Sequence, residues 1–281
     1  MLRHAELLTL REFGKSLTDD RRLRGCGRKI RRGVVGDADE ILETTCYCHR
    51  AWLCPVCGDR VAREQYRRVT KTLTAWTAQG GSVAFLTLTQ SHSAEDELDI
   101  LWDRLEDGWD TMLRGSGWRA DQKSFGLRGY VRLTEVVQHP DNGWNVHFHV
   151  NLLFDEELDH QRLCQLKDRL TARFVRGIRA AGGQASFAGQ DLHPMEPNSE
   201  NRLAGYCVKG TTVGQSEGSK TPMGILTSLK ETGEGVGLWK EFSAAVTEKK
   251  RRRYNPSQGI GKLVRTGRYI GPASGGREAI S

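Results

Sequence analysis

The chain has 281 residues, a net charge of +7 and seven cysteines. This length is sufficient for one large domain or two small ones, each with its own core. The sequence contains no run of 18 or more apolar residues, and its first ten residues lack the blocks of a signal peptide, so we expect a soluble, cytoplasmic protein without a membrane partner. An odd number of cysteines, mostly in the first fifth of the chain, fits metal-bound thiolates better than a disulfide framework.

Positive charge is concentrated in one part of the chain. Between Arg21 and Lys71 there are thirteen Lys or Arg residues and six Asp or Glu residues. The difference, +7, equals the net charge of the whole sequence. A second basic run covers Lys249–Arg253. Localised charge of this kind indicates a polyanionic partner, most simply a nucleic acid backbone, although a charge run is also a common solvated surface.

Periodicity and turn residues predict a mixed α+β protein. In chain order, we expect weak helical patterning over 1–20, a cysteine-rich segment over 21–60 and a basic helix over 61–78. A strand over 82–90 and a helix over 94–113 follow, and then a hairpin of strands over 128–138 and 145–154. The remaining elements are a helix over 158–181, a weak strand within 184–192, a short helix carrying Leu203, Tyr206 and Lys209, and two small helices over 225–231 and 238–249. The order from residue 82 favours a ferredoxin-like or related split α+β sandwich. We expect three units: a zinc-binding, DNA-contacting module over 1–78, a catalytic domain over 79–215, and a helical tail over 216–281.

Two histidines alternate with large apolar residues in Asn145–Phe154. Because side chains alternate between the two faces of a strand, His147 and His149 leave one face, and Val146 and the even-numbered residues after it form a buried face. The histidines would then stand on the side that water, a metal and a substrate could reach. The pair is a candidate metal clamp, although such a short motif also occurs as two polar residues on a solvated face.

A carboxylate on the preceding strand could complete this site. If Glu135 pairs with His149 across the hairpin, and Val137 with His147, Glu135 projects from the histidine face. Two imidazoles and a carboxylate suit Mn²⁺ or Mg²⁺ bridging a phosphate, or Zn²⁺. A slip of one residue would send Glu135 to the other face, and His92 is the competing ligand.

Tyr206 and Lys209 are three residues apart in the predicted short helix, so they are neighbours on one face. A phenol that attacks phosphorus needs its anion stabilised and its leaving oxygen neutralised, and an ammonium with a divalent metal would supply both. The same spacing also arises when an aromatic residue packs into a core beside a snorkelling lysine.

The cysteine-rich segment offers more thiols than a closed zinc site needs. Four ligands complete a structural Zn²⁺ site, and the segment supplies five thiols, Cys26, Cys46, Cys48, Cys54 and Cys57. The spacing Cys54-Pro55-Val56-Cys57 is that of a zinc knuckle. Cys164 and Cys207 fall on predicted helices, where packing is the simpler interpretation.

Taken in order, these motifs resemble those of the rolling-circle plasmid replication initiators of the HUH endonuclease superfamily. Phe85–Thr89 resembles the first strand motif, His147-Phe148-His149 the metal pair, and Tyr206-Cys207-Val208-Lys209 the nucleophile helix. Two further segments, 48–57 and 221–242, resemble the actinobacterial-type plasmid branch. The likeness extends over roughly residues 20–260, and its specificity comes from five motifs in order rather than from any single one.

The resemblance implies an HUH-type split β-α-β sandwich preceded by a zinc-binding module and followed by a helical tail. It implies that Tyr206 attacks a phosphate of origin DNA, single-stranded at the nick site, remains joined to the 5′ phosphate and releases a 3′ hydroxyl that primes a host polymerase, with a host helicase as a further partner. His147, His149 and Glu135 would hold Mn²⁺ or Mg²⁺, and Lys209 would balance charge near the phosphate.

The resemblance also favours one set of zinc ligands, with Cys46 or His49 as alternates. That set is Cys26, Cys48, Cys54 and Cys57. Basic residues around it are expected to contact origin phosphates, namely Arg28, Arg31, Arg60 and Arg67.

One position departs from the family pattern. Several members have a Glu four residues before the tyrosine, where it is thought to activate water for the terminating cleavage, and this chain has Arg202 there. Glu200 or Glu196 could substitute, or Arg202 could contact phosphate. Two rival functions are a rolling-circle transposase or relaxase with the same chemistry, and a non-enzymatic zinc-ribbon DNA-binding regulator whose His-x-His pair is only surface.

Overall fold

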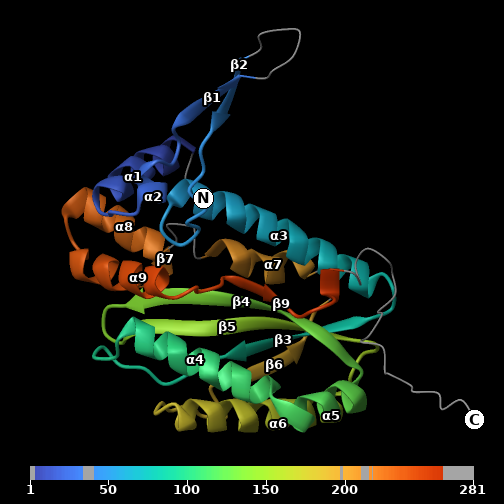
Figure 1. Ribbon diagram of the computed structural model, residues 1–281. Helices are drawn as coiled ribbons and strands as arrows, with labels where there is room; N and C mark the ends of the chain where they lie inside the picture. Colours follow the sequence, from blue (N-terminus) through green and yellow to red (C-terminus); the bar gives the residue numbers. More distant parts are fainter. Residues whose placement is uncertain (1–3, 34–40, 197–198, 210–214, 217, 262–281) are drawn as a thin grey trace, which may run out of the picture.

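The computed structural model describes residues 4–33, 41–196, 199–209, 215–216 and 218–261 (Figure 1). The helices are α1 (His4–Ser16), α2 (Arg21–Arg24), α3 (Pro55–Thr77), α4 (Leu98–Leu113), α5 (Gly115–Phe125), α6 (His160–Ala180), α7 (Glu200–Lys209), α8 (Pro222–Thr232) and α9 (Val236–Glu248). The strands are β1 (Lys29–Gly33), β2 (Ile41–Thr45), β3 (Ser82–Leu88), β4 (Leu127–His139), β5 (Gly143–Phe154), β6 (Asp191–Pro194), β7 (Gln215–Ser216), β8 (Ser219–Lys220) and β9 (Tyr254–Pro256). No helix in this part of the chain is long and apolar enough to cross a membrane.

The central sheet is antiparallel, with strand order β6-β3-β5-β4-β8-β7 and with β9 also paired to β4. The run β3-α4-α5-β4-β5-α6-β6 follows the β-α-β-β-α-β order of the ferredoxin-like split sandwich. The predicted mixed α+β class and antiparallel sheet are therefore confirmed.

Turn chemistry fixes the β4–β5 hairpin where the sequence predicts it. Gly143, the last residue of the turn segment, has φ 72°, and a Cβ there would lie 2.6 Å from the carbonyl oxygen of Ser93. Only glycine meets both conditions without strain. The hairpin holds β4 and β5 in the centre of the sheet, where most of the candidate site is built.

Helices cover both faces of the sheet (Figure 1). On one face α4, α5 and α6 pack against the even-numbered residues of β5, and Phe148, Val150 and Leu152 are fully buried there. On the other face α3 and α7 cover a smaller cluster that includes Leu73, Phe85, Leu133 and Leu203. The expectation that the histidine face is open to water is thus wrong in part, because two helices lie over it.

Helices α1 and α2, from the beginning of the described chain, lie beside α8 and α9 at one end of the molecule (Figure 1). Trp52, from the loop before α3, packs edge-on against Trp102 of α4 and Phe242 of α9. The proposed divisions at residues 78 and 215 stay predictions. Buried residues among 4–33 and 41–78 belong to both hydrophobic clusters, together with residues of later elements.

Several elements differ from the sequence expectation. Helix α5 was not anticipated, because its sequence is glycine-rich and polar; its Asp121 is fully buried in ion pairs with Arg169 and Arg173 of α6. Helix α3 begins six residues early, at Pro55, because Cys54 is its N-cap and proline is favoured in the first turn. The last residues of the predicted tail, 262–281, lie outside the described chain.

The basic run Lys249–Arg253 is not simply a solvated surface. Lys249 and Arg251 form ion pairs with Asp99 and Asp103 of α4. Arg253 is 7% exposed and lies over the ring of Trp52. Part of this charge therefore ties the C-terminal segment to the body of the protein.

Candidate functional site

Glu135, His147 and His149 converge on one face of the β4–β5 hairpin. Glu135 Oε2 lies 2.8 Å from His149 Nε2 and 3.2 Å from His147 Nε2. One ligand atom from each residue lies within 4.8 Å of the others, and no further His, Cys, Asp or Glu of the described residues joins them. His149 is 6% exposed and Glu135 9%, so the group lies largely below the surface.

The pairing register differs from the sequence expectation by two residues. Glu135 is opposite His147, not His149, and Leu133 is opposite His149. A slip of two residues preserves the face from which a side chain projects, because the strand period is two. The expected grouping therefore forms although the expected pairing is wrong. His92, the competing ligand, instead has its Nδ1 2.8 Å from the carbonyl oxygen of Asn142.

The two histidines determine the protonation of Glu135. Burial favours its neutral form, but hydrogen bonds and charge from His147 and His149 outweigh burial and hold the pKa of Glu135 well below its ordinary value. The carboxyl is therefore an anion, which is the form that binds a cation.

These three residues fit a divalent metal. Two imidazole nitrogens and one carboxylate oxygen are the donor types that bind Mn²⁺, Mg²⁺ or Zn²⁺. The Nδ1 atom of His147 is buried and has no hydrogen-bond partner among the described residues, whereas the Nε2 atoms of both histidines face the Glu135 carboxylate. The identity of the metal does not follow from the donors.

Tyr206 packs directly on this group. Its ring centroid lies 3.9 Å from that of His149, and it stacks on Phe85 of β3 with a centroid separation of 5.1 Å. Phe85 also stacks on His149, so the rings of Phe85, His149 and Tyr206, from β3, β5 and α7, pack against one another in a cluster. The structure thus brings Tyr206 to the carboxylate and histidine group. Lys209 ends α7, and its side chain lies outside the described part of the structure.

Residues that sequence reasoning missed also reach this face. Thr87 pairs with both His149 and Asp191, which places Asp191 and, two residues on, His193 on the face that carries the histidines. His193 Nδ1 is 2.8 Å from Asp191 Oδ2, and the His193 ring lies against Phe85. The weak strand that the sequence predicts within 184–192 overlaps β6 by only two residues, because the alternation in Asp191–Pro194 is too short to fix the bounds of a strand.

A tyrosine assigned to the tail lies on the same face. Tyr254 of β9 pairs with Leu133, the neighbour of His149, and packs against the cluster under α3 and α7. Sequence reasoning had no means to place it there, because β9 pairs with a strand more than a hundred residues earlier.

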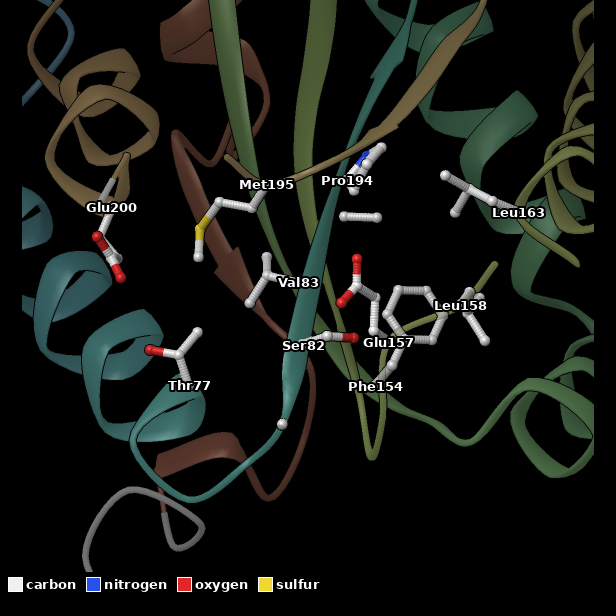
Figure 2. Close-up of a pocket in the computed structure, with 12 residues that line it drawn as sticks. Thr77, Ser82, Val83, Phe154, Glu157, Leu158, Leu163, Pro194, Met195 and Glu200 are labelled. Carbon is white, nitrogen blue, oxygen red and sulfur yellow. The ribbon is translucent and has the colours of Figure 1, made fainter. Parts of the chain in front are cut away.

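The residues considered for water activation do not join this group. Arg202 is paired with Glu196, with Nη2 2.9 Å from Oε2. Glu200 lines a pocket of about 380 Å³ at the beginning of β3. In Figure 2 the Glu200 side chain extends from α7 and lies on the same side of the strand as Thr77, Val83 and Met195. The pocket extends along β3 to Ala84, three residues or roughly 10 Å from Thr87, which pairs with His149. Glu135, His147 and His149 do not line it, so the candidate metal ligands lie outside this pocket.

The four favoured cysteines come together in a second group. Cys26 follows α2, Cys48 follows β2, and Cys54 and Cys57 lie at the start of α3. Backbone hydrogen bonds of Gly27 to Cys46 and of Cys46 to Arg28 close the base of the β1–β2 hairpin and bring its two ends together. Cys46 is not a member of this group.

Sulfur separations in this group match a tetrahedral metal site. The Sγ atoms of Cys26 and Cys54 are 3.7 Å apart, as are those of Cys26 and Cys57, and Cys48 and Cys57 are 3.5 Å apart. Disulfides require about 2.05 Å, whereas a tetrahedron with Zn–S bonds of about 2.3 Å has edges of about 3.8 Å. All four thiols are buried.

The protonation of these thiols is coupled. Hydrogen bonds with Cys48 and Cys54 lower the pKa of Cys57, and hydrogen bonds with Cys48 and Cys57 raise the pKa of Cys54. The fold thus stabilises one thiolate at the expense of its neighbours. Four thiolates would need a cation, which a structural Zn²⁺ supplies.

The predicted DNA-contacting arginines lie on α3 and on the segments that carry the cysteines. Arg28 and Arg67 are exposed, and Arg60 is exposed with its guanidinium 4.5 Å from the ring centroid of Tyr47. The side chain of Arg31, on β1, lies outside the described part of the structure.

Part of the chain is similar to known proteins. Residues 40–164 match the family model described as "Replication protein". The chain is 27% identical over 139 residues to a "Neomycin resistance protein" of Streptomyces cyanogenus, over 41% of this chain and 32% of that protein. It is 26% identical over 141 residues to a "Protein rep" of Streptomyces lividans, over 41% of this chain and 31% of that protein. No solved structure matches.

These similarities confirm the resemblance to plasmid replication initiators that the motifs indicate. The match to the family model includes Glu135, His147 and His149 and ends before Tyr206. The chain spans about a third of the length of the curated relatives it matches.

Proposed function

We propose that this protein initiates rolling-circle replication of a plasmid by metal-dependent nicking of one DNA strand at the origin, with Tyr206 as nucleophile. The observation that carries the proposal is the contact of the Tyr206 ring with His149, whose Nε2 shares Glu135 Oε2 with His147. A replication-protein match over 40–164 supports it independently. The antiparallel sheet with helices on both faces agrees with the HUH-type sandwich that the motifs imply.

The proposed reaction exchanges one phosphodiester for another. The Tyr206 oxygen bonds to the scissile phosphorus while the bond from phosphorus to the 3′ oxygen breaks, so the DNA 5′ phosphate stays on the protein. The phenol loses its proton, and the departing oxygen gains one to become a 3′ hydroxyl. A divalent metal held by Glu135, His147 and His149 would polarise the phosphate and stabilise charge on the departing oxygen.

The protein's own residues prepare this step. Phe85 packs on both Tyr206 and His149 and so restricts the position of the phenol. Thr87 Oγ1, 3.5 Å from His149 Nδ1, together with Glu135 at Nε2, limits rotation of that imidazole. Holding nucleophile and metal ligands in one geometry removes orientational entropy from the barrier. Lys209, on the same helix as Tyr206, would balance charge.

The cysteine cluster has a separate role in this proposal. Cys26, Cys48, Cys54 and Cys57 would hold one structural Zn²⁺, and the basic residues near it would contact origin phosphates. A host helicase and a host polymerase would act on the nicked product, and these steps would take place in the cytoplasm.

Detection of the covalent adduct tests the proposal directly. Single-stranded oligonucleotides that tile the DNA flanking the gene are labelled at the 3′ end, because the proposed chemistry leaves the 3′ segment on the protein. With Mn²⁺, we expect one oligonucleotide to give a labelled protein band in a denaturing gel, and the same oligonucleotide labelled at the 5′ end to give a shorter free product. Tight binding without either product would favour the non-enzymatic regulator.

A further inference from the structure

A cationic cleft of about 290 Å³ lies between the loop 49–53 and the C-terminal segment that includes Lys249–Arg253. Six of its lining residues are Lys or Arg, and none is Asp or Glu. The loop joins Cys48 to Cys54, so one wall of the cleft belongs to the cysteine cluster. A concave surface with charge of one sign attracts an anion.

Along Lys249–Arg253, side chains that contact the body of the protein alternate with side chains that are exposed. Lys249 and Arg251 pair with carboxylates of α4, and Arg253 is buried over Trp52. Lys250 and Arg252, between them, are exposed and form no ion pair with the described residues. Three cations therefore fix the segment, and two remain available to a ligand.

Hydrogen bonds join this cleft to both candidate sites. Trp52 Nε1 donates to the carbonyl oxygen of Arg251 at 2.9 Å, which ties the segment to the loop between the cysteines. Thr134 donates through Oγ1 to the carbonyl oxygen of Arg252 and through its backbone N–H to that of Arg253, each at 2.9 Å. Thr134 precedes Glu135 in β4, so a ligand on Arg252 is held in a fixed relation to the metal-binding group.

We propose that this cleft binds a backbone phosphate of the DNA strand outside the scissile position, with Lys250 and Arg252 as its contacts. The proposal rests on DNA being the substrate. Trp52 is 8% exposed and packed in the core, so the one exposed aromatic ring among the residues that line the cleft is the imidazole of His49, against six Lys or Arg side chains. Contacts made by exposed cations alone recognise phosphate and position the strand without reading its sequence.

A salt titration of DNA binding tests this proposal. The variant Lys250→Gln/Arg252→Gln is compared with the control variant Lys230→Gln/Arg179→Gln. The control also removes one Lys and one Arg charge, but from exposed positions on α8 and α6. The probes are fluorescent 20-nucleotide duplexes and single strands of random sequence, followed by anisotropy between about 50 and 200 mM salt. Melting temperature and zinc content of each variant establish that it has folded.

We expect the cleft variant to bind more weakly and with a salt dependence shallower by about 0.9 per lost duplex contact, or about 0.7 on a single strand, while the control keeps the wild-type slope. Equal slopes in the two variants would overturn the proposal. If AMP at matched ionic strength abolishes DNA binding, the proposal is also overturned, because that result assigns the cleft to a free nucleotide.

The proposed phosphate site in the cleft and the proposed nicking reaction can be refuted independently of each other. Because the proposed phosphate lies outside the scissile position, the cleft variant should still form the Tyr206 adduct on a short oligonucleotide centred on the nick. A wild-type protein that binds DNA with the expected slope but forms no adduct would refute the nicking function and leave the cleft intact.

Discussion

Glu135 lies directly opposite His147 across the β4–β5 hairpin, and a single carboxylate oxygen of Glu135 approaches a ring nitrogen of both His147 and His149. In this arrangement the carboxylate compensates for the burial of two imidazoles, and the imidazoles keep the carboxylate charged. A divalent cation would exchange these mutual contacts for three bonds to itself without moving the strands. The backbone register thus brings together three residues that could hold a metal.

Substitution of the metal ligands should separate metal binding from folding. We expect His147→Ala to reduce Mn²⁺ affinity by at least about 10- to 100-fold, since loss of outer-sphere partners alone costs that much. The buried face of β5 is unchanged in this variant, so the metal-free protein should still fold, with a melting temperature lowered by the loss of the His147 contact to the buried Glu135 carboxylate. Calorimetric titration with Mn²⁺ measures the affinity, and His92→Ala is the matched control. Equal affinity in both variants would show that the histidine pair binds no metal.

Tyr206→Phe should abolish the covalent adduct and leave DNA affinity within about twofold of wild type. The variant removes only the nucleophilic oxygen and keeps the ring that packs on Phe85 and His149. Tyr254→Phe, on the same sheet face, is the control and should retain the adduct. An adduct that persists in Tyr206→Phe and disappears in Tyr254→Phe would transfer the nucleophile to β9.

Local patterns were sufficient to predict the strands that carry the site. The turn ending at Gly143 and the alternation through Val146–Phe154 are properties of neighbouring residues, and both hold in the structure. Alternation determines the face of a strand but not its register, because a slip of two residues leaves every side chain on the same face. Glu135 was therefore assigned to the correct face with the wrong partner.

Contacts between distant segments could not be predicted in this way. Helix α5 depends on Asp121 and two arginines of α6, and β9 pairs with β4 across more than a hundred residues. The cover that α3 and α7 place over the histidines follows from tertiary packing rather than from any local period. For the same reason the run Lys249–Arg253 indicated a polyanionic partner or a solvated surface, whereas Lys249 and Arg251 form ion pairs with α4 in the structure.

The ion pairs of Asp99 should make the C-terminal segment sensitive to acid. Burial favours the neutral acid, but Lys249 and Arg251 outweigh burial and lower the pKa of Asp99 below its ordinary 3.8. A depressed folded-state pKa contributes stability above the unfolded-state value, and that stability is lost as pH falls through the folded-state value. Asp99→Asn should therefore reduce the free energy of unfolding at pH 7 by about 1 kcal/mol, with allowance for solvent screening.

The difference between Asp99→Asn and wild type should shrink below about pH 4, as Asp99 becomes protonated in the wild type. Urea denaturation at pH 7 and pH 3 measures both values. Glu157→Gln, at an exposed acid with no ion pair to the described residues, is the control. A difference that is the same at both pH values would show that the charge of Asp99 does not stabilise the segment.

Removal of a single thiol should release zinc and loosen more than the cysteine loop. The Sγ atoms of Cys26, Cys48 and Cys54 surround that of Cys57, so Cys57→Ser leaves a three-thiolate site with much weaker zinc affinity. Because structural zinc contributes folding energy, and because Trp52 in the adjoining loop packs against Trp102 and Phe242, hydrogen exchange should accelerate in α2, at the start of α3 and in α9. Cys164→Ser, at an exposed thiol on α6, should retain one zinc per chain by elemental analysis and wild-type exchange. Wild-type protein that contains no zinc, or faster exchange confined to residues 26–57, would contradict this coupling.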